Sequence, residues 1–350
     1  MSYRGSNISQ GLARRRPNDI ASALSRKILG QPDAIDAIVP CIEMHRAMLA
    51  PEGRPVGIFL LIGPTGTGKT RTVEALAEVL HGSPKKILKL DCGEFQMDHE
   101  VAKLIGAPPG YLGHRETQPW LTQQKLNATT SEECDLALLL FDEIEKASLS
   151  LMRLLLGILD KGTLRLGDGT TVNFEKTIIF LTSNLGAREM SQELHPEYGF
   201  EALIPRPAAE DTKLENIGWA AVRKSFSPEF INRIDSFIAY RPLESQALAA
   251  IFDIQVNELQ DQIDTRLGPQ AFRLEIAPKA RRALIETGTS EQYGARELKR
   301  TLQRFLIQPL AAMVAAGEIA GGTRIRAELS VRKGALVFRT IREEALAPAC

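Results

Sequence analysis

The sequence predicts an α/β fold in which a parallel sheet has helices on both faces and is followed by a smaller, mainly helical domain with short strands. Three observations support this prediction. Short apolar runs alternate with segments of helical periodicity over the first two thirds of the chain, as in parallel sheets covered by helices. A glycine-rich phosphate-binding motif lies between one apolar run and the next helical segment. After Pro242 the chain changes to long helical segments with few apolar runs.

The composition limits the class of protein. The chain has 350 residues, of which 44% are hydrophobic, so it can bury a core and has room for two domains. Its 43 basic and 43 acidic residues balance, which argues against a nucleic-acid or acidic-membrane partner. The apolar run Leu136–Phe141 is too short to cross a bilayer, and the polar N-terminus does not resemble a leader. We therefore predict a cytoplasmic protein without membrane contact. The cysteines are widely spaced, which argues against a disulfide framework or a metal site: Cys41, Cys92, Cys134 and Cys350.

We divide the chain into a flexible tail (1–17), a large α/β domain (18–241), a smaller, mainly helical domain (242–342) and a second tail (343–350). The large domain is predicted to begin with a helix from Asn18 to about Ile28 and a second from Asp33 to Leu49. Its sheet strands are the apolar runs Gly57–Ile62, Lys86–Leu90, Leu136–Phe141 and Thr177–Leu181, with a hairpin formed by Thr163–Leu166 and Thr171–Phe174. In the small domain we expect a helix (Glu244–Leu267), a strand (Phe272–Ile276), two more helices and two closing strands (Arg324–Leu329 and Ala335–Ile341).

The phosphate-binding motif follows the first strand and opens a helix, which is the context that its chemistry requires. Its residues are Gly63, Pro64, Thr65, Gly66, Thr67, Gly68, Lys69 and Thr70. Glycines let backbone N–H groups surround phosphate oxygens, and the helix N-terminus adds positive potential. We expect Lys69 to contact the β and γ phosphates of ATP and the Thr70 hydroxyl to bind Mg²⁺.

Two other strand ends complete the predicted ATP site. The strand Leu136–Phe141 ends in Asp142 and Glu143, so we expect Asp142 in the Mg²⁺ shell and Glu143 as activator of the attacking water. The next strand ends near Asn184, which can orient the same water. An acidic turn and an ordinary turn asparagine are the alternative interpretations of these residues.

The sequence resembles the Clp branch of the AAA+ ATPases, in particular the second nucleotide-binding module of ClpB, ClpA and ClpC unfoldases. The likeness lies in GPTGTGKT (63–70), LIGAPPGYLG (104–113), LLFDEIEKA (139–147), FLTSNLG (180–186), SPEFINRID (227–235) and YGARELKR (293–300). It implies an AAA+ P-loop domain with a helical lid, assembled as a hexamer with ATP between subunits. It also implies that Ile28 and Leu29 pack the adenine.

The resemblance assigns roles to residues that the sequence alone would leave as surface groups. Arg233 would be an arginine finger that reaches the neighbouring subunit's γ-phosphate, and Arg296 a lid arginine that senses nucleotide within its own subunit. Tyr111 and Leu112 would form a pore loop that grips a threaded polypeptide, although a tight turn is the alternative. The segment His114–Trp120 departs from the acidic, glycine-rich stretch usual in the family, which leaves the substrate class open.

These observations predict a ring ATPase that unfolds or remodels proteins by threading them through a central pore. The chain has no room for a first ATPase module or an N-terminal substrate domain, so we expect substrates to arrive through an adaptor or directly. Tyr198, Gly199 and Phe200 resemble the tripeptide with which some unfoldases dock a ClpP-like peptidase, with tyrosine in place of an aliphatic residue. Covering the loop's own core is the alternative for these side chains. A AAA+ module acting on nucleic acid and a regulatory ring subunit without turnover are the competing functions.

Overall fold

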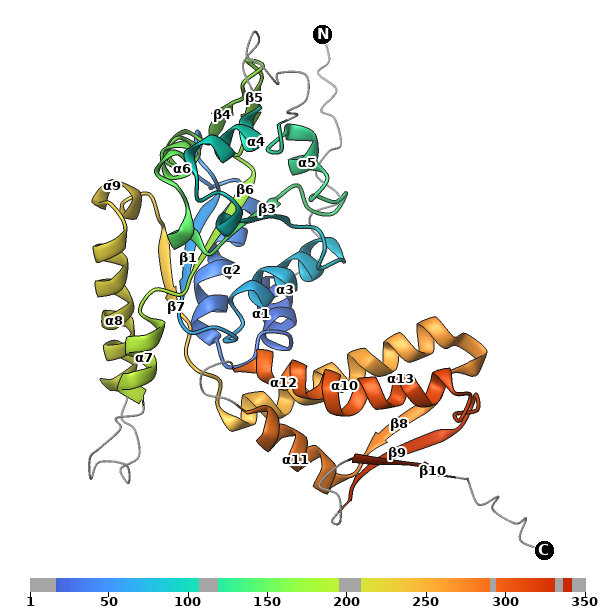
Figure 1. Ribbon diagram of the computed structural model, residues 1–350. Coiled ribbons are helices and arrows are strands. Elements are labelled where there is room, and N and C mark those ends of the chain that lie inside the picture. The colour runs from blue at the N-terminus through green and yellow to red at the C-terminus, as the bar shows by residue number, and fades with distance from the viewer. Residues whose placement is uncertain (1–16, 107–118, 195–208, 290–293, 331–335, 342–350) are drawn as a thin grey trace, which may run out of the picture. The chain divides into compact units, whose positions relative to one another are not determined.

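The computed structural model describes residues 17–106, 119–194, 209–289, 294–330 and 336–341 (Figure 1). The chain divides into two compact units, the first comprising Met1–Pro64 and Gly68–Arg241 and the second Thr65–Thr67 and Pro242–Cys350. The first unit carries a parallel sheet and the second a smaller sheet with helices. Each unit is described by itself below.

The first unit is built on a five-stranded parallel sheet with the strand order β2-β3-β6-β1-β7. Its strands are β1 (Gly57–Ile62), β2 (Leu88–Asp91), β3 (Ala137–Asp142), β6 (Thr177–Ser183) and β7 (Ser236–Ala239). The central strands are apolar and buried on both faces, which is why they form continuous hydrophobic runs instead of alternating ones. Phe59 of β1 lies opposite Phe180 of β6, and their rings stack with centroids 5.5 Å apart.

Helices cover both faces of this sheet (Figure 1). Side chains of alternate strand residues point to opposite faces, so Phe59 and Leu61 enter one core and Ile58 and Leu60 the other. The first core is closed by α1 (Pro17–Ser25), α2 (Pro32–Arg46) and α3 (Lys69–His81), and the second by α6 (Leu149–Lys161), α8 (Ala209–Ser225) and α9 (Pro228–Ile231). The remaining elements are short: η2 (Cys92–Glu94), η3 (Asp98–Val101), α4 (Ala102–Ile105), α5 (Gln123–Asn127), η4 (Ile144–Lys146), the hairpin β4 (Thr163–Arg165) and β5 (Thr171–Asn173), and α7 (Ala187–Leu194).

The predicted fold class is confirmed, whereas several element boundaries differ. The first helix ends at Ser25 instead of Ile28, because the amides of Lys27 and Ile28 both turn back to the carbonyl of Leu24. The second ends at Arg46 instead of Leu49, and β2 begins at Leu88 instead of Lys86. The edge strand β7 was missing from the prediction. The two predicted tails lie largely outside the described residues.

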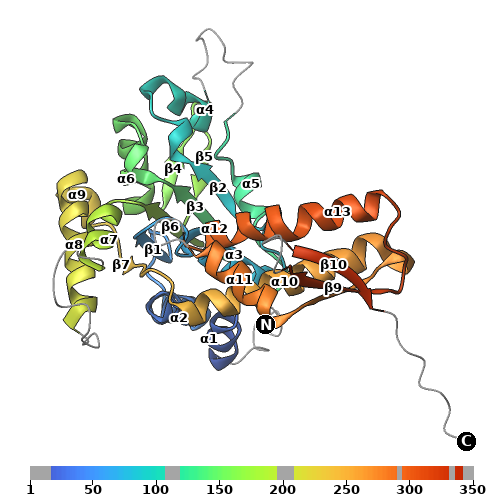
Figure 2. The same ribbon diagram turned by 60° about the horizontal axis from the view of Figure 1, so that its bottom comes forward.

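The second unit has a three-stranded sheet, β10-β9-β8, packed with helices (Figure 2). Its elements are α10 (Ser245–Leu267), η5 (Gly268–Gln270), β8 (Arg273–Ile276), α11 (Pro278–Gly288), α12 (Ala295–Leu302), η6 (Gln303–Ile307), α13 (Gln308–Ala315), β9 (Arg324–Leu329) and β10 (Leu336–Ile341). Phe252, Leu302 and Ile325 lie in its core. The segment η6 is a π-helical turn between α12 and α13, and it precedes Pro309, whose ring nitrogen has no N–H to donate to an α-helical ladder.

Candidate functional site

The phosphate-binding loop leaves the carboxyl end of β1 and enters α3, as its sequence predicted. Gly63 has a φ of 141°, and a Cβ there would lie 2.5 Å from the carbonyl oxygen of Tyr240, so a side chain is excluded. Gly68 has a φ of 105° and caps α3, and a Cβ built on it meets no atom within 4 Å. The loop is therefore shaped by glycine, with open space above Gly68 at the positive end of a 13-residue helix.

Lys69 is the first residue of α3, and its side chain is turned into the loop. Its exposed fraction is only 8%, and its Nζ donates hydrogen bonds to the carbonyl oxygens of Gly63 (2.6 Å) and Pro64 (2.9 Å). A third bond reaches Oδ1 of Asn184 at 2.9 Å. A buried ammonium group needs such acceptors to offset its lost hydration. The hydrogen bond between Lys69 and Asn184 shows that these two residues, predicted from separate motifs, lie in one site.

The carboxylates at the end of β3 are fixed from the neighbouring strand. The Thr182 hydroxyl of β6 accepts a hydrogen bond from the backbone N–H of Glu143 at 3.1 Å and donates one to Oδ1 of Asp142. The other Asp142 oxygen pairs with Nζ of Lys89 at 2.7 Å. The β3–β6 register sets Phe141 opposite Leu181, which brings Thr182 to the carboxyl end of β3.

Glu143 is held in an unusual backbone conformation. Its φ of 57° is one that residues other than glycine rarely adopt. One of its carboxylate oxygens, Oε2, accepts a hydrogen bond from Nζ of Lys146, and this bond raises the pKa of the Lys146 ammonium. The other oxygen, Oε1, lies 3.4 Å from Nδ2 of Asn184, whose backbone N–H donates to Oε1 of Glu145 at 3.1 Å. Asn184 thus touches both Lys69 and Glu143.

The predicted magnesium ligands fit a hard cation. Asp142 offers a partly buried carboxylate and Thr70, in the first turn of α3, a half-buried hydroxyl, and Mg²⁺ prefers such oxygen ligands. Among the described residues, no three His, Cys, Asp or Glu side chains cluster as a metal site. Asp142 and Thr70 would hold Mg²⁺ together with water and phosphate oxygens, which is the usual arrangement in nucleotide sites.

The predicted adenine contacts lie in the turn between α1 and α2. Ile28 is buried in the core with α3, and Leu29 is half-buried. The nearby Gln31 side chain is 5% exposed and donates to the carbonyl of Arg241 at 2.8 Å, while the amide of Arg241 donates back at 3.2 Å. Because Tyr240 packs against Gly63, this turn is tied to the start of the phosphate loop.

Arg233 lies away from these groups. It precedes β7, and Asp235 N–H donates to the carbonyl of Ile58 at 2.9 Å, near the amino end of β1. Because β7 runs parallel to β1, Arg233 lies near the amino ends of the strands. Lys69 lies at the other end of the sheet, beyond the carboxyl ends of the strands. The distance along β1 from Ile58 to Ile62 is about 13 Å at strand rise. Arg233 is therefore not brought to the phosphate loop of its own chain.

The other predicted residues are either in the second unit or not described. Arg296 is exposed in the first turn of α12. The segments with Tyr111, Leu112 and most of His114–Trp120, and with Tyr198, Gly199 and Phe200, lie outside the described residues. Sequence reasoning missed Thr182 and Lys146 as members of the site. For Lys146, its position three residues after Glu143 was the signal in the sequence that could have predicted the contact. For Thr182 the sequence held no comparable signal.

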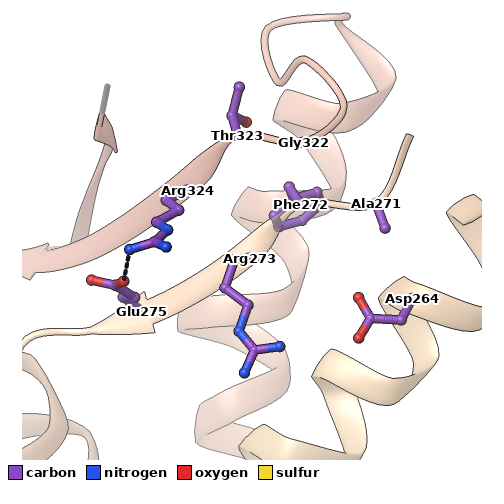
Figure 3. A pocket seen from close by; sticks show the side chains of 8 residues that line it. All are labelled: Asp264, Ala271, Phe272, Arg273, Glu275, Gly322, Thr323 and Arg324. Carbon is purple, nitrogen blue, oxygen red and sulfur yellow. Dashed lines mark ion pairs between the residues drawn. The ribbon is translucent and has the colours of Figure 1, made fainter. Parts of the chain in front are cut away.

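The second unit has a pocket of about 510 Å³ beside β8 and β9 (Figure 3). It is lined by Asp264, Ala271, Phe272, Arg273, Glu275, Gly322, Thr323 and Arg324. Arg324 and Glu275 face each other at 4.0 Å, so part of the charge in the lining is already neutralised. None of the predicted site residues lines this pocket.

Comparison with known proteins gives two family matches. A family described as an AAA domain (Cdc48 subfamily) matches residues 54–237, and one described as the C-terminal, D2-small domain of ClpB protein matches residues 243–327. The chaperone protein ClpB of Meiothermus ruber is 36% identical over 302 residues, covering 86% of this chain and 33% of the relative. ClpB of Pseudomonas putida is 37% identical over 306 residues, covering 87% and 33%. The chain thus spans about a third of the length of the curated relatives that it matches.

Two solved structures are similar to the whole chain. A structure titled as a closed-state reconstruction of Hsp104 with ATPγS and FITC casein has a TM-score of 0.76 at 27% identity, covering 93% of this chain and 51% of that one. The extended conformation of the S. cerevisiae Hsp104:casein complex has a TM-score of 0.79 at 28% identity, covering 95% and 54%. With the phosphate loop and carboxylate pair in place, the two family matches identify the chain as a member of the AAA+ ATPases of the Clp type, with a ClpB-like small domain.

Proposed function

We propose that this chain hydrolyses ATP in a ring, a hexamer by its resemblance to the family, and uses that energy to unfold or remodel proteins. One observation carries the proposal. Lys69, Glu143 and Asn184 gather at the carboxyl edge of the sheet, whereas Arg233 is fixed at the opposite edge. An arginine in that place does not reach the phosphate loop of its own chain, as expected for a residue that serves the site of another subunit, so the arrangement favours a ring with ATP at its interfaces.

Within one subunit the roles follow from the contacts. Lys69 would exchange its carbonyl partners for the β and γ phosphates, and the glycine loop would supply backbone N–H donors. Glu143, held by Asn184 and Lys146, is the base for the attacking water. Mg²⁺ bound by Asp142 and Thr70 would neutralise phosphate charge. Arg233 supplies positive charge to the neighbour's γ-phosphate, a contribution of about 10³ to 10⁵ in rate in related chemistry. Arg296 would sense nucleotide from the lid.

The substrate is inferred to be polypeptide. The curated relatives carry the name chaperone protein ClpB, and the titles of both similar structures name casein as the companion of Hsp104. By the resemblance, Tyr111 and Leu112 would grip the threaded chain. Threading through a pore, delivery by an adaptor and a cytoplasmic location remain predictions. The departure from the family pattern at His114–Trp120 leaves the class of polypeptide substrate open. In the described part of the chain, every helix is too short or too polar to cross a membrane.

Delivery to a ClpP-like peptidase is the second candidate, and no observation favours it. The residues on which it depends, Tyr198, Gly199 and Phe200, lie outside the described part of the chain. The curated relatives cited above carry the name chaperone protein ClpB, and no peptidase is named with them. We therefore place a free-standing remodelling ATPase first.

The test compares two substitutions in the same pocket. Lys69→Ala should abolish ATP binding, because it removes a phosphate contact, whereas Glu143→Gln should keep binding and stop hydrolysis. Nucleotide binding is measured with a fluorescent ATP analogue, and turnover by phosphate release. ATP-dependent loss of fluorescence from a folded reporter protein measures unfolding. Equal loss of ATP affinity in both variants would disprove the site, and turnover without any effect on protein substrates would disprove the remodelling function.

A further inference from the structure

The side chain of Arg233 has a partner within its own subunit. Its Nε lies 3.0 Å from Oδ1 of Asp160, on α6. The side chains are 35% and 43% exposed, so the pair lies at the surface, although the Nε atom itself is shielded from solvent. The contact is an ion pair that lacks the alignment of a hydrogen bond.

The backbone around Arg233 is rigid. The short helix α9 is capped by Ser227, whose hydroxyl accepts from the amide of Phe230 at 3.3 Å, and Phe230 is completely buried. The amide of Arg233 donates to the carbonyl of Phe230 at 3.1 Å. Two residues later, Asp235 accepts hydrogen bonds from the Ile58 amide at 2.9 Å and from the Arg54 guanidinium at 2.6 Å. The backbone on both sides of Arg233 is thus held by hydrogen bonds.

The C-terminal end of α6 is fixed against the same region. Gly162 ends the helix with a φ of 59°, and a Cβ there would lie 3.1 Å from Cα of Arg54, so the two segments touch through their backbones. Arg54 in turn pairs with Asp235. Asp160 therefore faces Arg233 from a rigid support.

The position of Asp160 is electrostatically unfavourable for α6 by itself. A carboxylate in the last turn of a helix is repelled by the negative end of the helix dipole, which costs stability. The Arg233 guanidinium offsets that cost, and the helix terminus attracts it as well. Asp160 engages the Nε side, and among the residues that the structure describes no other ion pair or hydrogen bond engages the side chain of Arg233. The two terminal NH₂ groups are left to bind another group.

We propose that Asp160 is a positioning residue for the arginine finger. It holds one edge of the Arg233 guanidinium and presents the other to the γ-phosphate of the neighbouring subunit. This inference rests on the proposed role of Arg233. Asp160 does not touch nucleotide, and its effect passes entirely through Arg233 into the adjacent site.

The test uses the full chain with Asp160→Asn, which keeps the shape of the side chain and removes its charge. We expect kcat for ATP hydrolysis to fall about tenfold, as for a misplaced catalytic group, with KM unchanged within about twofold. Asp160→Glu should recover most of the loss. Asp135→Asn is the matched control, because Asp135 is similarly exposed at 44%, contacts the His45 ring and forms an ion pair with Lys176, and it should keep wild-type kcat.

Mixed rings distinguish positioning from a structural role. Lys69→Ala subunits lack a working pocket but supply a correctly held finger, so adding them should raise turnover per Asp160→Asn subunit about threefold or more. A defect confined to the fold of the variant subunit would gain nothing from such neighbours. Unchanged or increased kcat in Asp160→Asn, or no recovery in co-assembled mixtures, would overturn the proposal. If Arg233→Ala loses activity while Asp160→Asn does not, only the positioning role fails, whereas full activity in Arg233→Ala would disprove the finger itself.

Discussion

Asn184 is the residue that connects the two halves of the candidate site. Its amide oxygen accepts from Lys69 and its amide nitrogen faces Glu143, so one side chain contacts both the proposed phosphate-binding group and the proposed water activator. A γ-phosphate that draws Lys69 toward it would free the Asn184 oxygen. In the proposed mechanism the same asparagine would then orient water beside Glu143, so nucleotide binding would affect the proposed base through Asn184.

Site residues that belong to a short sequence motif were predictable, whereas residues that reach the site only through strand pairing were not. Lys69 and Asp142 belong to patterns in which spacing alone indicates a role. Thr182 was not predictable in that way, because its contacts with Asp142 and Glu143 depend on the β3–β6 register. The positive φ of Glu143 is likewise a property of the assembled strand end and leaves no mark in the sequence.

His81 provides a prediction for the stability of the large unit. It is 9% exposed in the last turn of α3, with Nδ1 3.0 Å from the Ser131 hydroxyl. Burial, with a smaller contribution from Lys86, lowers its pKa from 6.5 to about 4. Above pH 6.5 the ring is neutral in both states and contributes no pH dependence. Between pH 6.5 and 4 the unfolded chain binds the proton more readily, so stability falls as pH falls.

We therefore expect His81→Leu to lose less stability than the wild type on acidification. Between pH 7.5 and 5.5 the difference in the change of unfolding free energy should be about 1 kcal/mol, measured by urea denaturation at each pH. Comparing changes within each protein removes the constant effect of the lost Ser131 contact. Parallel pH dependence in the two proteins would show that His81 titrates normally in the fold.

At the scale of elements, the central strands were predictable because burial on both faces leaves long apolar runs. Gly57–Ile62 matches the predicted bounds. Arg324–Leu329, in the small sheet, matches them as well, although its first residues alternate between exposed and buried. The strand β7 was missed because it has four residues at the sheet edge, of which only Ile238 is fully buried, and it follows the charged stretch that contains Arg233 and Asp235. Its position is set by polar contacts with β1, which hydrophobic periodicity does not report.

Asp235 should therefore matter more to the attachment of β7 than an exposed ion pair would. Asp235→Ala leaves the part-buried amide of Ile58 without its acceptor and should destabilise the fold by about 1–3 kcal/mol. Arg54→Ala removes only the ion-pair partner of the other Asp235 oxygen, Oδ1. It should lower the free energy of unfolding by about 0.2–1 kcal/mol. Asp235→Asn keeps an acceptor oxygen and should recover much of the loss. Chemical denaturation orders the three variants, and equal effects of Asp235→Ala and Arg54→Ala would contradict this account.

At the scale of the whole molecule, the parallel sheet separates two groups of proposed site residues. Its carboxyl edge carries Lys69 and Glu143, as expected for ligand sites in parallel α/β sheets, and its amino edge carries Arg233 and Asp160. The resemblance to Clp ATPases led to the assignment of Arg233 in advance. The partner on α6 was not predictable, because 73 residues of sequence separate the two groups and only the fold joins them.

A mixture of two inactive variants tests this separation directly. Arg233→Ala keeps its own pocket, so it should bind ATP normally yet hydrolyse it about 10³-fold or more slowly, because its neighbours lack a finger. Lys69→Ala keeps its finger but has no working pocket. Rings assembled from both contain interfaces where a Lys69→Ala finger meets an intact Arg233→Ala pocket, so phosphate release should reappear and be greatest near equal proportions. Co-assembly is verified independently by energy transfer between labelled subunits. Continued inactivity in rings shown to be mixed would mean that Arg233 does not act on the adjacent subunit.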